Sequence, residues 1–351
     1  MKRPLLRSLG LVLFVIASFM AVSWSRPGAA GRTGRSREFP VALASLVPPD
    51  DPLAVQDLLF DPRFARTALE YLDSGRPPAL LAALSDSPAA AFLLGHARQF
   101  GYDIPHATAR ELVGELLKDR TASSPGTATC RQSLAYFSGP MLADPRWVAD
   151  VLLYLPSGFR FSGTLFLTYG YDIGVALAPD ASLNGSHSRF SGKPRELMFY
   201  GIHELHHVGF MTCAPPPRLD SIKTCADVYR FALYFTQLEG MAVWAAYGPR
   251  RAAGALDSEE DYVALRDEAR MDRDEKSYLE ILEELRRRGN EPADPSAMSA
   301  IERLSQGERL WYRVGAKMAA RIEKARGRQA LVDLIRLGPA DFFKAAGRGL
   351  P

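Results

Sequence analysis

The sequence predicts an α+β fold that is predominantly helical, with a small β-sheet in the middle of the chain and a helical C-terminal part. Apolar residues recur at spacings of three and four from about residue 58 to 117 and again from 297 to 343, which is typical of packed helices. Between these regions, residues 159–169 are rich in aromatic and β-branched residues and are followed by Gly-Val-Ala-Leu-Ala at 174–178, which predicts two short strands. Residues 250–294 are highly charged and helix-forming, which indicates a solvated helical layer.

The first residues have the layout of a secretory signal. Lys2, Arg3 and Arg7 precede an apolar run at 9–24, and small residues follow it. The run is short for a membrane-spanning helix, which needs about 20 apolar residues. We expect residues 1–36 to be a signal peptide with a linker, so that the protein is exported to a periplasmic or extracellular location. A retained signal anchor, which attaches the protein to the membrane through residues 9–24, is the alternative.

The rest of the chain divides into three predicted regions: a helical N-terminal region at 37–128, a core at 129–250 and a C-terminal helical subdomain at 251–351. The apolar spacing predicts N-terminal helices at 58–72, 78–84, 89–100 and 108–117. Residues 121–129 are expected to form a loop, and 143–155 an amphipathic helix. The net charge of +3 over 351 residues is small, so we expect no nucleic-acid partner.

The two predicted strands lie directly before the next helical segment, and we expect them to form a hairpin. An open edge of this hairpin could take a peptide as an added strand. The alternative is that the hairpin only packs against the helix.

The segment that follows contains His203-Glu204-Leu205-His206-His207, which fits the pattern H-E-x-x-H. On a helix, residues four apart lie on the same face, so His203 and His207 can bind one cation. Glu204 lies beside them and can reach a water on that cation, which is the arrangement of a zinc hydrolase with two ligands and one general base.

The surrounding residues 196–210 favour a buried helix, for which 191–194 offer an N-terminal cap. Buried histidines and glutamates must be paired, and a metal would pair them. His206 is expected to pack or to support the site rather than to bind the metal. Coincidental histidines on a surface helix are the alternative.

A second strong helix is predicted at 227–247, with Glu239 beside its apolar stripe. A glutamate against an apolar face is costly unless it is paired. As a third zinc ligand, Glu239 would complete two histidines and one carboxylate and leave a position open for water. The alternative is a glutamate at the helix margin that reaches solvent or an arginine.

Export permits disulfides, and Cys213 and Cys225 flank a loop with three successive prolines. A bridge between them and two free thiols are both compatible with the sequence. Cys130 is expected to be a buried thiol.

The H-E-x-x-H motif together with Glu239-Gly240-x-Ala242 resembles the gluzincin metallopeptidases. The segment 311–343 is also similar to the C-terminal helices of a group of bacterial zinc-dependent peptidases. The likeness covers roughly residues 130–345. It implies a zincin-like core in which the small sheet precedes the H-E-x-x-H helix.

The resemblance implies that Zn²⁺ is held by His203, His207 and Glu239 and that Glu204 is the general base. The oxyanion of such a reaction needs a second donor besides the metal. Tyr312 is our candidate, with Tyr229 and Tyr234 as rivals, and for each a packing role is the alternative.

We therefore expect a zinc metallopeptidase, a hydrolase that acts on a peptide or protein substrate. Two alternatives remain at this point. One is a zinc-containing binding module without catalysis, and the other is a metal-free helical scaffold protein of the cell envelope.

Overall fold

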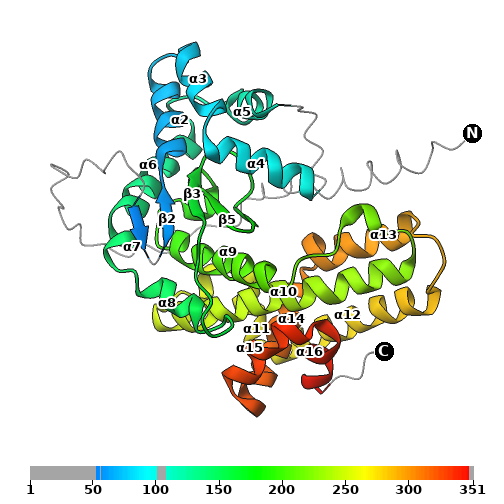
Figure 1. Cartoon of the computed structure of the whole chain (residues 1–351). Coiled ribbons are helices and arrows are strands. Elements are labelled where there is room, and N and C mark those ends of the chain that lie inside the picture. The colour runs from blue at the N-terminus through cyan, green and yellow to red at the C-terminus, as the bar shows by residue number, and fades with distance from the viewer. Residues whose placement is uncertain (1–52, 56, 101–107, 348–351) are drawn as a thin grey trace, which may run out of the picture.

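The computed structural model describes residues 53–55, 57–100 and 108–347, and in this part of the chain helices surround a five-stranded sheet (Figure 1). The predicted α+β class is confirmed. The helices of the first half are α2 (Arg63–Asp73), α3 (Pro78–Ser85), α4 (Pro88–Gln99), α5 (Ala109–Leu117), α6 (Pro125–Ser138), α7 (Pro140–Ala143) and α8 (Arg146–Leu152). Those of the second half are α9 (Glu196–Cys213), α10 (Cys225–Ala252), α11 (Glu260–Leu265), α12 (Glu268–Arg288), α13 (Pro295–Glu302), α14 (Leu310–Arg326), α15 (Arg328–Leu337) and α16 (Pro339–Ala345).

The sheet combines strands from two distant parts of the chain. Its order is β1 (Leu53–Val55), β2 (Leu58–Asp61), β3 (Thr164–Thr168), β5 (Asp180–Asn184) and β4 (Gly174–Leu177). The pairs β2–β3 and β3–β5 are parallel, whereas the two outer pairs are antiparallel. β4 is therefore an edge strand.

The predicted hairpin is wrong in its pairing. The segments 159–169 and 174–178 do contain β3 and β4, but β5 lies between these two strands. β5 has the sequence Asp-Ala-Ser-Leu-Asn and lacks the β-branched and aromatic residues that mark a strand. Its pairing with β3 is reinforced by Asp180, whose carboxylate accepts a hydrogen bond from the backbone N–H of Thr164 at 2.7 Å.

The helix predicted at 58–72 is wrong at its start, because residues 58–61 form β2 and α2 begins at Arg63. Leu58 and Phe60 are buried while Leu59 is exposed, an alternation that a strand satisfies. The loop predicted at 121–129 is shorter than expected, since α6 begins at Pro125. The other predicted N-terminal helices are confirmed as α3, α4 and α5.

α9 packs against β4 and β5 on one side and against α10 on the other, and α10 packs in turn against α14 (Figure 1). Its buried side chains lie all round the helix, as the sequence predicted. The cap predicted at 191–194 is wrong: the helix begins at Glu196, and Arg195 makes no side-chain cap. A tertiary contact fixes this end instead, because the Glu196 carboxylate accepts a 2.8 Å hydrogen bond from buried Arg250 on α10.

The charged segment 250–294 is solvated only on its outer face. There, ion pairs such as Arg286–Glu283 join residues along α12. The inner face of α12 packs against α10 and α14, and Tyr278 on it is fully buried. The pattern of charges did not reveal this inner face.

The structure has Cys130, Cys213 and Cys225 as free thiols, so it shows no bridge between the last two. Cys130 is buried, as expected. Residues 1–36, with the predicted signal, lie outside the described residues. In the part that is described, no single helix is long and apolar enough to span a membrane, although the bent pair α3 and α4 passes by length and composition. The predicted region boundaries remain predictions.

Candidate metal centre

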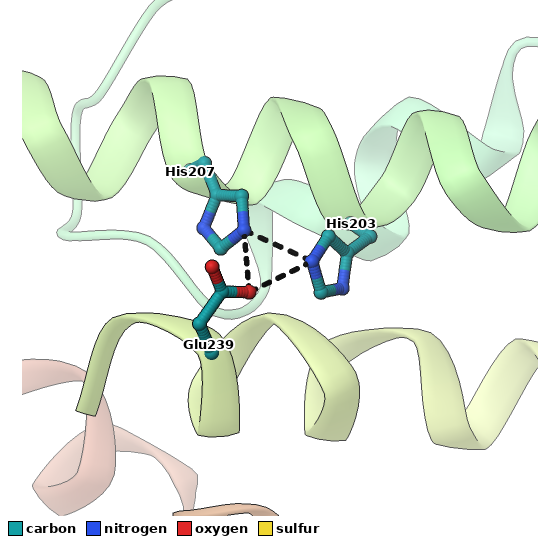
Figure 2. Close-up of side chains that lie close together, drawn as sticks. All are labelled: His203, His207 and Glu239. Atoms are coloured by element: carbon teal, nitrogen blue, oxygen red, sulfur yellow. Dashed lines mark hydrogen bonds and ion pairs between the residues drawn. The ribbon is translucent and has the colours of Figure 1, made fainter. Parts of the chain in front are cut away.

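Two imidazole nitrogens lie next to each other on α9. His203 and His207 are one helical turn apart, and their Nε2 atoms are 2.9 Å from each other, with the ring planes at 83°. Figure 2 shows both rings pointing from α9 toward α10. The spacing of four residues thus places both nitrogens on the face of the helix that meets its neighbour.

α10 supplies a carboxylate to the same point. The Oε2 atom of Glu239 lies 3.1 Å from Nε2 of His203 and 3.0 Å from Nε2 of His207 (Figure 2). The donor atoms of these three residues all lie within 4.8 Å of one another. The structure therefore brings together the three side chains that the sequence nominated as ligands.

The chemistry of this donor set fits a divalent cation. Burial and the neighbouring His207 lower the pKa of His203 to about 4, so its ring is neutral and its nitrogen has a lone pair to offer. Burial by itself would raise the pKa of Glu239, but its interactions with His207 and His203 outweigh burial and lower it, which keeps the carboxylate ionised. The same carboxylate outweighs burial at His207 and raises the pKa of that ring. Atoms bound at about 2.0–2.2 Å to one tetrahedral zinc lie roughly 3.3–3.5 Å apart, close to the spacings found here.

Glu204 lies beside this group and has no hydrogen-bond partner among the described residues. It is buried, and burial raises the pKa of its carboxyl to about 8, although the nearby His207 acts in the opposite direction. Gly174 on β4 leaves room for this carboxylate, because a Cβ added there would lie 2.6 Å from its Oε1. The edge strand of the sheet thus passes directly against Glu204.

Two glycines allow α10 and α14 to cross in backbone contact. A Cβ added to Gly315 would lie 2.2 Å from the carbonyl oxygen of Thr236, and one added to Gly240 would lie 2.2 Å from the carbonyl carbon of Gly315. This crossing brings Tyr312, one turn before Gly315, beside His203, with ring centroids 6.4 Å apart and planes at 18°. Burial raises the pKa of Tyr312, so its hydroxyl stays protonated.

Residues 145–345 match the family described as "Putative zinc dependent peptidase (DUF5700)". The chain belongs to this family. No curated protein and no solved structure matches the chain. The matched range begins just before α8 and ends with α16, so it contains the three donor residues, Glu204 and Tyr312. A zinc peptidase family is thus supported at this general level.

The structure also distinguishes the three tyrosines that the sequence offered as donors to the oxyanion. The Tyr234 hydroxyl is occupied, because it donates a 2.7 Å hydrogen bond to the carbonyl of Ala214. Tyr229 is near the charges of Arg286 and Glu283 on α12, whereas Tyr312 is the tyrosine that stacks on His203.

His206 is fully buried and is not part of the donor group. Its ring centroid lies 6.2 Å from that of Phe210, one turn along the helix. This position agrees with the packing role expected from the sequence.

Sequence reasoning missed the residues that shape the site rather than line it. Gly174 lies in a predicted strand, where a glycine can mark a close approach, and that signal could have been used. Gly315 carried no such signal, because a glycine inside a helix has several explanations. Arg309, which packs on Tyr312, lies inside the predicted helical region 297–343 and stood out in no pattern.

Proposed function

We propose that this protein is a zinc-dependent peptidase of gluzincin type, in which His203, His207 and Glu239 hold the metal. One observation carries the proposal: three metal-donor atoms from two helices converge next to a buried carboxylate, Glu204, that has no partner among the described residues. Membership of a zinc peptidase family supports the same conclusion. The donor set leaves room for water, since structural zinc sites have four protein ligands and catalytic sites have three.

Zinc, when bound, acts as a Lewis acid that activates water and polarises a carbonyl group. Glu204 accepts the proton of the attacking water, because its carboxylate is the free basic group beside the donor atoms. It then returns this proton to the amine that leaves. Its raised pKa of about 8 favours a group that can both take and release a proton near neutral pH.

Tyr312 is the proposed donor to the oxyanion that develops on the substrate. Its position over His203 places it beside the donor group, and its raised pKa keeps the phenol as a hydrogen-bond donor. The backbone contact between Gly240 and Gly315 holds α14 close enough for this role.

The edge strand β4 is the proposed support for the substrate backbone. β4 passes against Glu204 at Gly174, so a peptide added along this edge would run next to the proposed general base.

The test combines metal analysis with cleavage of a peptide library by three proteins: wild type, Glu204→Gln, and Glu280→Gln as a control on an exposed glutamate of α12. Wild type and both variants should hold about one equivalent of zinc. Glu204→Gln should lose about 10²–10⁴-fold in turnover, and Glu280→Gln should not.

Three results would count against the proposal in different ways. Absence of zinc would remove the metal, and the helical scaffold would remain. Zinc without cleavage of any peptide would favour a binding module. Full activity of Glu204→Gln would assign the base to another residue.

A further inference from the structure

Arg309 lies directly before α14, next to the proposed catalytic tyrosine. It follows the π-helical turn Arg303–Gly307 and has a left-handed backbone, with φ of 52°. A residue other than glycine is rare in this region and persists only where its surroundings fix it. Its side chain explains what fixes it.

The guanidinium of Arg309 packs on the proposed active-site tyrosine. Its Cζ lies 3.8 Å from the ring centroid of Tyr312, whose ring is stacked in turn on His203 at 6.4 Å. The cation is thus no farther from the His203 ring than these two distances added together. A peptide extends by about 3.3 Å per residue, so this reach corresponds to a group within about three residues of the bond that is cleaved.

One edge of the Arg309 guanidinium is hydrogen-bonded to a buried carboxylate, and the other edge is open to a ligand. Nε and Nη2 donate to Oδ2 of buried Asp261 at 2.9 and 2.8 Å. Among the described residues, no partner is found for Nη1. The side chain is 35% exposed, whereas Arg313, which shares Asp261 and also lies 3.5 Å from Asp274, is 8% exposed. Only one of the two arginines on Asp261 can therefore meet a solute.

A guanidinium held flat on a ring and fixed by a buried carboxylate has lost its side-chain freedom before any ligand arrives. Its remaining N–H groups are arranged to bind a carboxylate, the anion whose geometry arginine matches. Pre-organisation of this kind lowers the entropic cost of binding.

We propose that Arg309 binds a carboxylate of the substrate close to the scissile bond. This inference rests on the proposed peptidase function. The carboxylate is either the C-terminus of a peptide, in which case the enzyme removes C-terminal residues, or an acidic side chain.

Three N-acetylated pentapeptides that differ only at their C-terminal end distinguish these sources. The first ends in an uncharged residue with a free terminal carboxylate, and the second ends in the same residue as an amide. The third ends in aspartate with its terminus amidated. Cleavage by the zinc-loaded full chain is compared for wild type, Arg309→Gln, Arg309→Lys and the control Arg303→Gln, an exposed arginine paired with Glu308. Binding of the same peptides to Glu204→Gln, with and without Arg309→Gln, gives a readout that does not depend on turnover.

We expect wild type to favour at least one carboxylate-bearing peptide over the neutral amide by about tenfold or more in kcat/KM, and the favoured peptide identifies the source. Arg309→Gln should bring this ratio close to one, because the favoured carboxylate-bearing peptide loses more than the neutral amide does. Arg309→Lys should keep part of the ratio, and Arg303→Gln all of it. Peptide affinities should follow the same order.

A ratio near one in wild type, a ratio that survives in Arg309→Gln, or an equal loss for all three peptides would overturn the role of Arg309 while leaving the peptidase intact. A different result would be peptide binding that depends on the carboxylate and on Arg309, with no cleavage of any peptide. The binding role would stand, and the proposed hydrolysis would fail.

Discussion

Two helix interfaces each contain a buried glutamate, and the two carboxylates have different hydrogen-bond partners. Between α12 and α14, Glu275 accepts hydrogen bonds from Lys317 and Arg321 at 2.9 and 2.7 Å. Between α9 and α10, Glu239 meets two imidazoles, and neither lysine nor arginine donates to it in the described part of the chain. Glu275 thus has lysine and arginine as partners, whereas the group around Glu239 offers donor atoms to a cation from solution, and the arginine of the second interface, Arg250, pairs with Glu196 instead.

The largest expected effect is the loss of metal from the second interface only. Glu239→Gln should lower zinc affinity by more than about 100-fold, because it removes an anionic ligand and not merely a supporting group. Glu275→Gln should leave zinc affinity unchanged. Competition with a chromogenic chelator measures both, and equal affinities of the two variants would contradict the assignment of Glu239.

A smaller effect is expected where the sheet meets the general base. In Gly174→Ala the new Cβ would displace the Glu204 carboxylate, whose Oε1 lies 2.6 Å from that position. A misplacement of about 1 Å can reduce turnover about 10²-fold. Zinc content should stay at the wild-type value, and this is measured together with kcat. Unchanged kcat would show that Glu204 does not depend on its present position.

The crossing of α10 and α14 joins the two interfaces, because each of them contains one of these helices. Its contribution to the stability of the protein can be tested. Gly315→Ala would force the helices apart, since its Cβ would lie 2.2 Å from a backbone oxygen. Overpacking of this kind costs about 1–3 kcal/mol in the free energy of unfolding, measured with urea. Gly248→Ala on α10 is the control, because nothing lies within 4 Å of its added Cβ. Similar losses of unfolding free energy in Gly315→Ala and Gly248→Ala would contradict the close contact of the two helices at Gly315.

The smallest effect concerns pH and the first interface. Burial alone would raise the pKa of Glu275, but Arg321 and Lys317 outweigh it and lower the pKa to about 2. The stabilisation is therefore present above the unfolded pKa of about 4.3 and is lost as the pH falls toward 2.

After allowance for solvent screening, we expect wild type to lose about 1–2 kcal/mol across this window through Glu275. Glu275→Gln should lack that loss, while Glu280→Gln should keep it. Urea unfolding at a series of pH values from 5 to 2.5 measures the difference. Parallel curves for wild type and Glu275→Gln would contradict the prediction.

Much of the helical part of the fold could be predicted, because apolar spacing is a local property. The errors occurred where a partner strand decided the outcome. Residues 58–61 read as the start of a helix until β3 is available for pairing, and β5 has too little apolar character to be recognised alone. The start of α9 was misplaced because another helix fixes it, since Arg250 on α10 pairs with Glu196.

For the site, the sequence by itself determined that His203 and His207 share one face of a helix, because a spacing of four residues fixes this in any α-helix. It also nominated Glu239 from the cost of burying a lone carboxylate. Only the tertiary structure decided that Glu239 meets these histidines, that β4 meets Glu204, and that Arg309 and Tyr312 lie alongside. Such contacts depend on how helices and strands pack in three dimensions, and distance along the chain carries no information about them.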